Sequence, residues 1–473
     1  MAFFLCFCAE NPVTKTRELM FFSEKDEVAL GKGLDNDVRK EYGVYDDIGV
    51  TNYVQKVGKK VARVSHRSNL DFHFSVVDMD EVNAFALPGG YIYVTRGLLC
   101  YLNNEAQLAG VIGHEIGHVS YRHSMKALQA NIGTNILLNI IAMGTGSQFW
   151  AQVSDMMLGA IMAGYSRTYE NQADELAVDY MLKAHYDPYQ MRDFLYSLKR
   201  MEEGSVGFLL GIFASHPLTE ERIKNVQNVI KQNINDYRDK ALKIDEENFL
   251  HIIDGMPLEK EKGWIKDKNE LKNGKVGMAV PLRRGLIIEK GENPDELILF
   301  DRYQNYVIGV TPLKGRVAQQ EAIEEFEKKK SLQKKIYFGL YEDAQNTTLC
   351  IYRLNGSDLK VVFINMFPHL LAVSFIEKAS SRGELVWKEI IKKARKLDAE
   401  EMVKVAPGRI KVYEVEKKQT LKELLKSLYK DEKTIKKISV MNGLQEDYVL
   451  EPGKQIKLII TEEDSHLLNK LEH

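Results

Sequence analysis

From Val111 to His118 the chain reads Val-Ile-Gly-His-Glu-Ile-Gly-His, inside a helical pattern that runs from about Asn104 to about Ala130. Histidines four residues apart on a helix are separated by about 40° of rotation, so both imidazoles point to one side. The neighbouring residues are apolar, and burying His114, Glu115 and His118 among them is costly unless an ion pairs with them. The stretch therefore predicts a metal-binding helix.

This spacing is the His-Glu-x-x-His arrangement of zinc-dependent hydrolases, in which the glutamate reaches a water on the ion. The alternative is a helix whose histidines are ordinary half-buried side chains. Catalytic zinc usually takes three protein ligands and keeps a fourth position open, so a third ligand is needed. On a continuous helix His123 would point away from His114, which excludes it. Tyr121 and Ser124 stand where a metzincin has glycine and histidine, which excludes that class.

Two carboxylates further along the chain offer the missing ligand. Glu170 and Asp174 lie four residues apart in an amphipathic helical pattern and therefore share one face. One carboxylate can bind zinc while the other accepts the free ring N–H of a ligating histidine, which fixes the tautomer. The alternative is a pair of surface acids that repel each other mildly. The metal interpretation is favoured because a His-Glu-x-x-His helix precedes them.

Composition excludes several other classes of protein. The 473 residues include 65 basic and 67 acidic ones, so the net charge gives no case for nucleic-acid binding. The four cysteines form neither a metal-site pattern nor a disulfide framework. No segment has the roughly 20 strongly apolar residues of a spanning helix. The nearest, Ala127 to Ser154, is broken by polar residues and predicts a buried helix and a turn, followed by a helix around Met156 to Tyr165. Peripheral membrane contact is the alternative.

The N-terminal segment, residues 1–19, has two interpretations. Cys8 follows a short apolar run and precedes a polar segment, as the lipidated cysteine of a lipoprotein signal would. Phe7 stands where such a cleavage site requires a small residue, so a plain apolar N-terminal peptide is an equal alternative. The expected association with an envelope membrane is therefore peripheral or through a lipid anchor.

The predicted fold class is α+β, in three further parts. Residues 20–256 are expected to be mainly helical, with helices over 24–30 and 38–64 and from 105 to about 237. A strand over 71–77 and a hairpin around Leu87-Pro88-Gly89-Gly90 add a small sheet. Residues 257–400 predict a separate α+β domain of unknown role. We expect strands near 278, 287, 298 and 308, a helix over 318–330, strands near 336, 349 and 361, and helices from there to about 397.

Residues 408–462 predict a small β-α-α-β unit that resembles the LysM module. The motifs that carry this resemblance are Tyr413-Glu414-Val415, Thr420-Leu421, Asn442-Gly443-Leu444 and Leu450 to Gly453. Lys418-Gln419 stands where the module usually has Gly-Asp. This departure weakens the expectation of peptidoglycan binding and leaves the expected fold unchanged.

Glutamate and aspartate four residues apart after His-Glu-x-x-His form the gluzincin pattern. The fuller set of motifs resembles the family of the CAAX prenyl protease and membrane HtpX, in a soluble, envelope-located branch, and spans roughly residues 20–235. These motifs are Asn83-Ala84-Phe85-Ala86-Leu87-Pro88-Gly89-Gly90, Gly113 to His118, Ser166-Arg167 with Glu170 and Ala173-Asp174, and Ser215-His216-Pro217 with Arg222-Ile223.

The resemblance implies one zinc ion per chain, polypeptide substrates and a location in the periplasm or cell envelope. It implies that His114, His118 and Glu170 hold the zinc and that Asp174 orients His114. Glu115 would act as the general base on the attacking water. Three further residues, Asn83, Ala84 and Phe85, would form the sheet edge on which an extended peptide lies.

His216 has three interpretations. In the family this position stabilises the oxyanion, and in some members it is a fourth zinc ligand that latches the site. The alternative is a Ser-His-Pro turn before a helix. Arg222 would support the same pocket. The sequence thus predicts an envelope zinc endopeptidase, with a latched, chaperone-like or wall-binding protein as the alternative; the polar breaks disfavour a membrane-embedded enzyme.

Overall fold

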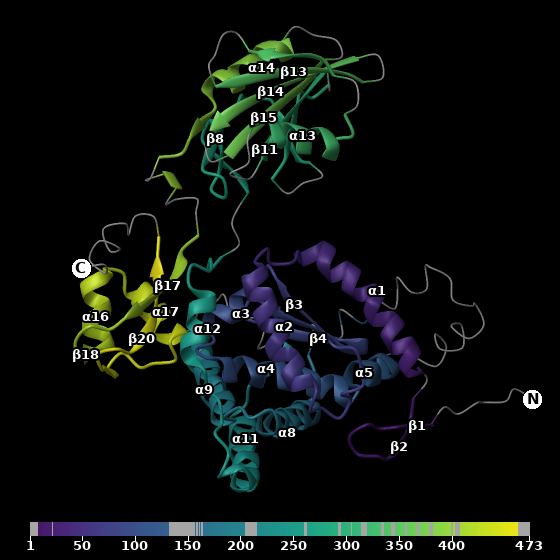
Figure 1. The fold of residues 1–473 in the computed structure, drawn as a ribbon, viewed down its shortest axis with the longest axis vertical. Helices are drawn as coiled ribbons and strands as arrows, with labels where there is room; N and C mark the ends of the chain where they lie inside the picture. The colour runs from purple at the N-terminus through teal and green to yellow at the C-terminus, as the bar shows by residue number, and fades with distance from the viewer. Residues whose placement is uncertain are drawn as a thin grey trace, which may run out of the picture. The chain divides into compact units, whose positions relative to one another are not determined.

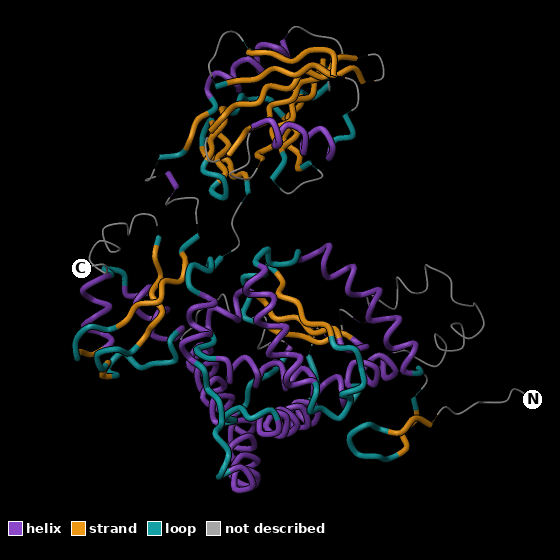
Figure 2. The backbone as a smooth tube through the Cα atoms, in the orientation of Figure 1, coloured by secondary structure: helices purple, strands orange, loops and turns teal. Residues whose placement is uncertain are grey.

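The computed structural model describes most of the chain in two compact units, shown by secondary structure in Figure 2. The first unit comprises Met1–Lys260 with Arg409–Ile460, and the second comprises Glu261–Gly408 with the last residues. Most of the apolar run Ala127–Ser154 and the start of the N-terminal segment lie outside the described residues. The described residues are 8–20, 22–131, 157, 159, 161, 164–203, 215–259, 263–291, 295–303, 305–313, 319–332, 335–341, 346–354, 357–366, 369–377, 382–398, 401–402 and 407–461.

A three-stranded sheet lies at the centre of the first unit (Figure 1). Its strands are β3 (His73–Val77), β5 (Tyr91–Thr95) and β4 (Ala84–Leu87), in that order, with β3 parallel and β4 antiparallel to β5. The predicted hairpin joins β4 to β5 through a turn at Pro88–Gly90. Gly89 has a φ of 74°, and a Cβ there would lie 2.7 Å from Cα of Val28, so the turn requires glycine.

Helices cover both faces of this sheet. Helix α1 (Glu24–Tyr42) packs on the face that carries Tyr91 and Tyr93. Helix α2 (Ile48–Ala62) lies against β3, where Gly58 meets the ring of Phe74. The predicted break between these helices was misplaced, because Gly43 with a φ of 76° ends α1 well after Leu30 and the Asp47 side chain caps α2.

The metal-binding helix is shorter than predicted. After α3 (Arg96–Tyr101), α4 (Glu105–Ser120) begins at Asn104, whose side chain accepts from the Gln107 N–H as expected of an N-cap. The prediction of one helix to about Ala130 is wrong. The chain breaks at Arg122, which has a φ of 58°, and resumes as α5 (His123–Asn131).

Helices continue to dominate the first unit, as predicted. Among the helices in the described ranges, none is long and apolar enough to cross a membrane. The remaining elements are the N-terminal strands β1 (Cys8–Glu10) and β2 (Arg17–Leu19), the helices α8 (Arg167–Lys183), α9 (Tyr189–Glu203), α11 (Glu220–Asn233) and α12 (Glu246–Ile253), and the short helix η2 (Ile234–Tyr237).

The C-terminal segment of this unit has the predicted β-α-α-β order. Its elements are β17 (Arg409–Glu414), β18 (Gln419–Thr420), α16 (Leu421–Leu428), α17 (Glu432–Met441), β19 (Val449–Leu450) and β20 (Gln455–Ile460). The segment packs on the helices that precede it. Lys457 is fully buried and donates from Nζ to the carbonyls of Cys100 at 2.9 Å and Leu102 at 2.6 Å. Arg200 of α9 donates to the Gly443 carbonyl at 2.6 Å.

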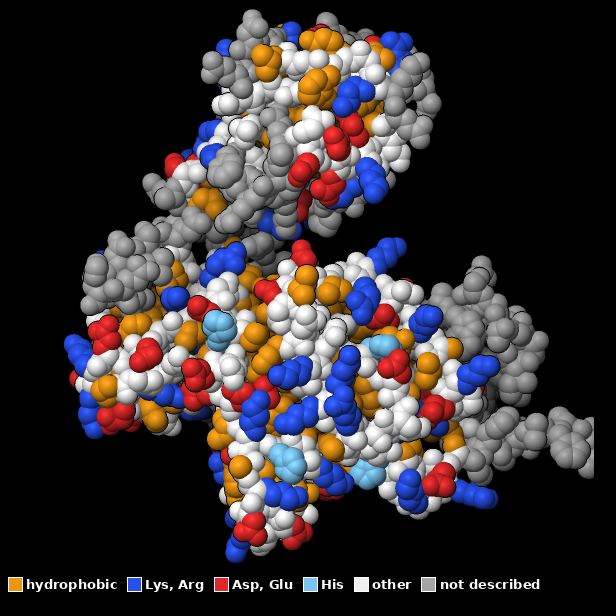
Figure 3. Space-filling model, in the orientation of Figure 1, with side chains coloured by type: hydrophobic (Ala, Val, Ile, Leu, Met, Phe, Trp, Pro, Cys, Tyr) orange, Lys and Arg blue, Asp and Glu red, His pale blue; other side chains and the backbone are white. Residues whose placement is uncertain are grey.

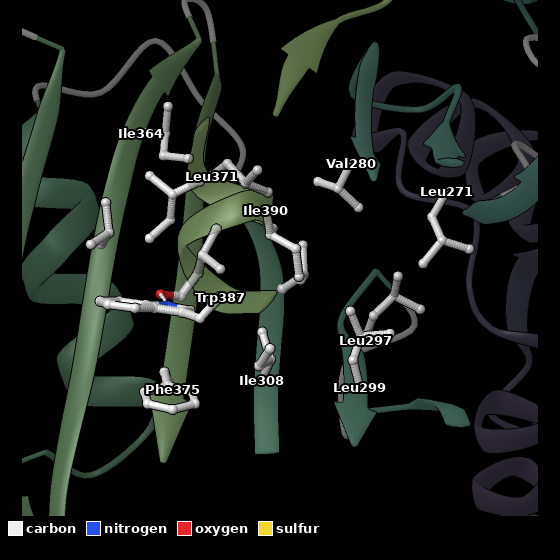
Figure 4. Close-up of a cluster of buried hydrophobic side chains, with 14 of the residues drawn as sticks. Leu271, Val280, Leu297, Leu299, Ile308, Ile364, Leu371, Phe375, Trp387 and Ile390 are labelled. Carbon is white, nitrogen blue, oxygen red and sulfur yellow. Dashed lines mark hydrogen bonds between the residues drawn. The ribbon is translucent and has the colours of Figure 1, made fainter. Parts of the chain in front are cut away.

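The second unit contains a seven-stranded antiparallel sheet with a helix on each face. The sheet order is β12-β13-β14-β15-β11-β10-β9. Val361 and Phe363 pack against α13, whereas Val362 and Ile364 point to the other face and pack against α14. Figure 4 shows the second core, where Trp387 of α14 stacks on Phe375 at 5.4 Å between ring centroids.

Several elements of this unit were predicted and others were missed. Strand β15 lies where helices were predicted, and neither β6 nor β7 of a second sheet, ordered β16-β8-β7-β6, was predicted. The elements are β6 (Trp264–Asp267), β7 (Glu270–Asn273), β8 (Met278–Pro281), β9 (Ile287–Lys290), β10 (Leu297–Phe300), β11 (Tyr306–Leu313), α13 (Gln319–Lys329), β12 (Lys335–Leu340), β13 (Thr347–Leu354), β14 (Ser357–Met366), β15 (His369–Glu377), α14 (Arg382–Lys393) and β16 (Arg395–Lys396).

Candidate active site

Two glycines bring α4 close to α8. A Cβ on Gly117 would lie 3.0 Å from both Cα and the carbonyl oxygen of Ala173, and a Cβ on Gly113 would lie 3.3 Å from Cα of Ala177. Contacts this short leave no space for a larger residue at position 117 without moving the backbone. The close approach places the carboxylates of α8 directly against the histidines of α4.

Four buried side chains from three segments converge on one point. His114, His118, Glu170 and His216 each offer one donor atom, and these atoms all lie within 4.8 Å of one another. The two Nε2 atoms of the α4 histidines are 3.0 Å apart, and each lies 3.4 Å from a Glu170 oxygen. Nδ1 of His216 lies 3.2 Å from both Glu170 oxygens.

This cluster fits a tetrahedral zinc ion. Zinc binds imidazole nitrogen and carboxylate oxygen at about 2.0–2.2 Å, so tetrahedral ligand atoms lie roughly 3.3–3.5 Å from each other. The separations of the ligand atoms here are close to that value, and imidazole with carboxylate is a donor set that zinc prefers. The three predicted ligands are thus brought together, and the structure adds His216 as a fourth.

Asp174 and Arg222 contact the side chains of this cluster on the side away from the ligand atoms. Oδ1 of Asp174 lies 2.8 Å from Nδ1 of His114, on the side of the ring away from the cluster. Arg222 donates from Nε and Nη2 to the two oxygens of Asp174, both at 2.8 Å, and its Nη1 lies 2.8 Å from Glu170. One guanidinium therefore pairs with both buried carboxylates, as its planar fork allows.

These contacts determine the charges of the site in the metal-free protein. Burial alone would lower the pKa of His114, but Asp174 and Glu170 outweigh it and raise the pKa to about 10. Burial would raise the pKa of Glu170, yet His216 and the α4 histidines hold it well below its usual range. Burial lowers the pKa of His118 well below its ordinary value. Zinc binding must therefore displace a proton from His114.

His118 has a different partner behind it. Its Nδ1 lies 2.9 Å from Nδ1 of His123, whose Nε2 lies 3.0 Å from Oε1 of Gln172. Burial lowers the pKa of His123 to about 3, so this ring is neutral. The sequence interpretation left His123 out of the ligands and assigned it no role, because it assumed a continuous helix. The break at Arg122 turns the ring back toward α4.

Glu115 is placed beside the cluster and outside it. The residue is 2% exposed, its Oε2 has no hydrogen-bond partner among the residues that the structure describes, and its Oε1 lies 3.5 Å from Nε2 of His216. Burial raises the pKa of this carboxyl above its usual range. A carboxylate with a raised pKa and a free oxygen is suited to accept a proton from a water molecule.

An apolar pocket of about 50 Å³ lies next to Glu115. One wall comes from α9, which contributes residues at helical spacing, and another comes from Val111 of α4. The α9 residues in the pocket are Met191, Phe194, Leu195 and Leu198. Ala84 of β4 also lines it, so the pocket adjoins the predicted peptide-binding strand.

The predicted strand edge is present but is buried. In the described part of the chain β4 is an edge strand of its sheet, yet Asn83, Ala84 and Phe85 are at most 2% exposed. Oγ of Ser215, next to His216, donates to Oδ1 of Asn83 at 3.1 Å. The segment that carries His216 therefore lies against the start of this strand. The role of the strand in substrate binding stays a prediction.

Residues 50–230, which contain every element of this site, match the family model described as Peptidase family M48. This region is therefore similar to peptidase family M48. The match supports a zinc-dependent metalloprotease, and its range begins in α2 and ends in α11. The narrower resemblance to the CAAX prenyl protease and HtpX, and the LysM-like module, stay predictions.

Curated relatives match the M48 region and not the whole chain. The beta-barrel assembly-enhancing protease of Escherichia coli K12 is 27% identical over 215 residues, which cover 44% of this chain and 44% of that protein. The mitochondrial metalloendopeptidase OMA1 of Arabidopsis thaliana is 30% identical over 45% of this chain and 43% of its own length. The metalloprotease YcaL of E. coli K12 is 29% identical over 38% of this chain and 73% of its own length.

Proposed function

We propose that this chain is a zinc-dependent endopeptidase of the cell envelope that hydrolyses peptide bonds of extended or misfolded polypeptides. The observation that carries the proposal is the position of Glu115, which presents a buried, unpartnered carboxylate oxygen beside a zinc-type ligand cluster. The apolar pocket adjoining both can take a substrate side chain while the scissile carbonyl lies at the cluster. The E. coli relative is named as a protease that enhances beta-barrel assembly, and this name motivates the envelope location.

His114, His118 and Glu170 would hold the zinc, which would serve as a Lewis acid for the scissile carbonyl and lower the pKa of a water molecule. Glu115 takes a proton from the attacking water as its oxygen bonds to the carbonyl carbon. The same carboxyl then gives the proton to the amine nitrogen as the C–N bond breaks, leaving a carboxyl and an amine product. Asp174, itself held by Arg222, keeps the ring of His114 in the ligating orientation.

The position of His216 suggests that the proposed active site has a closed and an open state. Its Nδ1 lies among the ligand atoms, in the position that an attacking water needs, so the described conformation is closed to catalysis. When the ring leaves that position, its N–H groups can donate to the oxyanion that forms on the carbonyl. The contact of Ser215 with Asn83 would open in the same movement, which frees the edge of β4 for a peptide.

A second candidate function rests on the same closed arrangement. If His216 never leaves the cluster, the chain is a latched protein of protease fold that acts as a chaperone-like or wall-binding factor. The C-terminal β-α-α-β segment would then supply the anchor, and peptidoglycan is the ligand that a LysM-like module would take. The unpartnered oxygen of Glu115 favours the enzyme, because a non-catalytic protein gains nothing from a buried unsatisfied carboxylate.

Metal analysis combined with a proteolysis assay tests the proposal. The purified protein should contain one zinc per chain and should cleave an unfolded, casein-type substrate. A chelator should abolish cleavage and added zinc should restore it. Glu115→Gln should keep the zinc and lose about 10²–10⁴-fold in cleavage rate, the usual contribution of a positioned acid–base group.

Two results would contradict the enzyme and favour the latched protein. One is full cleavage by Glu115→Gln, which would remove the proposed base. The other is no cleavage by either the wild type or His216→Ala, with zinc present in both proteins. A matched control is Glu175→Gln on α8, because Glu175 is an exposed carboxylate of the same helix and should change neither zinc content nor cleavage.

A further inference from the structure

We propose that His123 and Gln172 are positioning residues that act on zinc through His118. The three side chains form a hydrogen-bonded series, which fixes the orientation of the His118 ring and determines how strongly His118 binds zinc. This inference rests on the proposed zinc site and adds a role for two residues outside it. The series runs from Nε2 of His118 through Nδ1 to Nδ1 of His123, then from Nε2 of His123 to Oε1 of Gln172.

The direction of each hydrogen bond follows from the ligand atom. Nε2 of His118 points into the cluster, so it must be unprotonated to bind zinc, and the proton of the neutral ring is then on Nδ1. Two Nδ1 atoms 2.9 Å apart can share only one proton, so Nδ1 of His123 accepts. The proton of His123 is then on Nε2, where it donates to Oε1 of Gln172 at 3.0 Å. The ring N–H groups of His118 and His123 therefore each have an acceptor.

The fold holds His123 in this position from both sides. Its ring stacks on Tyr169 of α8 at 4.1 Å between centroids and 11° between planes. Arg122, in the left-handed conformation, starts the turn that returns the chain toward α4, and its Nε donates to Glu27 at 2.7 Å. His123 is 0% exposed, so water does not replace its contact with His118.

The two zinc-binding histidines of α4 therefore differ in the charge behind them. His114 is backed by the carboxylate of Asp174, whereas His118 is backed by a neutral imidazole and a neutral amide. An anion behind an imidazole makes it a more basic ligand. We therefore expect His118 to be the weaker ligand of the pair, and its strength to depend on the charge at position 172.

The rate at which the full-length, zinc-loaded protein releases zinc to a chromogenic chelator tests this series. His123→Phe keeps a ring for the stack on Tyr169 and removes the acceptor, so release should be about 10–100-fold faster, the usual range for losing such a partner. Gln172→Met, which has a similar shape and no acceptor, should also release zinc faster. Gln172→Glu puts a carboxylate at the half-buried end of the series and should release zinc several-fold more slowly than the wild type.

A structural role alone predicts a different pattern. If His123 and Gln172 only fill space, Gln172→Glu and Gln172→Met would release zinc at equal rates, and the proposal would be overturned. Wild-type release from His123→Phe would overturn it as well. The thermal midpoint of each metal-free variant shows whether that variant folds. If His123→Phe does not fold, the comparison of zinc release from Gln172→Glu and Gln172→Met tests the proposal. Tyr169→Phe is the matched control and should release zinc at the wild-type rate.

The readout separates this inference from the proposed function. Wild-type protein that binds no zinc would contradict both. If zinc-bound wild type cleaves substrate and the two variants at position 172 release zinc at equal rates, the proposed endopeptidase is supported. The proposed role of His123 and Gln172 is then contradicted.

Discussion

Arg222 binds both oxygens of Asp174, with Nε and Nη2 each 2.8 Å from its acceptor. This pair is buried, and its arginine is the cation that faces both Asp174 and Glu170. Without metal, this guanidinium and the protonated ring of His114 both face the buried carboxylates. Zinc held by the cluster would add further positive charge beside Glu170.

Arg222→Met should therefore destabilise the metal-free protein by about 3–5 kcal/mol, because it removes the guanidinium that both buried carboxylates share and leaves them paired with histidine alone. The loss should be smaller in the zinc-loaded protein, since the ion neutralises part of the same charge. Urea unfolding with and without zinc measures both values. Arg192→Met removes a partly exposed guanidinium paired with its neighbour Asp193, and should cost no more than about 1 kcal/mol. Equal losses with and without zinc would contradict the role given to Arg222.

Gly117→Ala should destabilise the protein although alanine favours helix. Its Cβ would press on the backbone of Ala173, and overpacking of this kind costs about 1–3 kcal/mol. Zinc affinity should fall with it, because α4 and α8 must move apart. Gly33→Ala in α1 is the matched control, since nothing lies within 4 Å of its added Cβ, and it should stabilise by about 0.5–1 kcal/mol. A Gly117→Ala protein as stable as Gly33→Ala would show that the helix contact is looser than described.

Glu27 anchors the turn that carries His123, and its substitution should be costly. Its two oxygens accept from Arg67 and Arg122, both at 2.7 Å, and all three side chains are buried. Glu27→Gln removes the carboxylate that pairs with Arg122 and leaves Arg67 with the exposed Glu24, and it should lose about 3–5 kcal/mol of unfolding free energy. Glu24 pairs with the same Arg67 at 3.0 Å but is 58% exposed, so Glu24→Gln should lose less than about 1 kcal/mol. Similar losses in the two variants, measured by urea unfolding, would contradict this assignment.

Lys457 should make stability depend on alkaline pH. Burial lowers its pKa from 10.5 to about 7, so between these values the unfolded chain binds a proton that the folded chain does not. Stability from this group therefore rises with pH across that window, by about 1.4 kcal/mol per pH unit, and is constant below pH 7. Lys457→Met should remove this slope relative to wild type. Lys454→Met, which removes a partly exposed lysine on the same segment, should retain it; loss of the slope in both would contradict the assignment.

The ligand cluster was largely predictable because helical spacing fixes which side chains share a face. His114 and His118 are four residues apart in α4, and Glu170 and Asp174 are four apart in α8, so each pair needs only one helix to be correct. The meeting of the two pairs depends on Gly113 and Gly117, whose effect becomes visible only once the partner helix is known.

The supporting residues could not be predicted in the same way. Arg122 adopts a left-handed conformation without glycine or asparagine to signal a turn, so the helical pattern was extended past it. Glu27 lies in a run of charged residues that is typical of a solvated first turn, yet it is 1% exposed because two arginines from distant segments pair with it. Strand β15 was missed because its apolar residues face helices on both sides of the sheet, so the alternation that marks a half-buried strand is absent.

Two different faces of helix α9 carry residues with different surroundings. Met191, Leu195 and Leu198 line the pocket beside Glu115, whereas Ser197 and Arg200 face the C-terminal segment, which Arg200 contacts at Gly443. Each added residue turns a helix by about 100°, so a single insertion would rotate the residues after it away from their present partners. Variation in this helix during evolution should therefore consist of substitutions and not of insertions or deletions. Substitutions on one face would change the proposed substrate pocket, and substitutions on the other face would change the contact with the C-terminal segment.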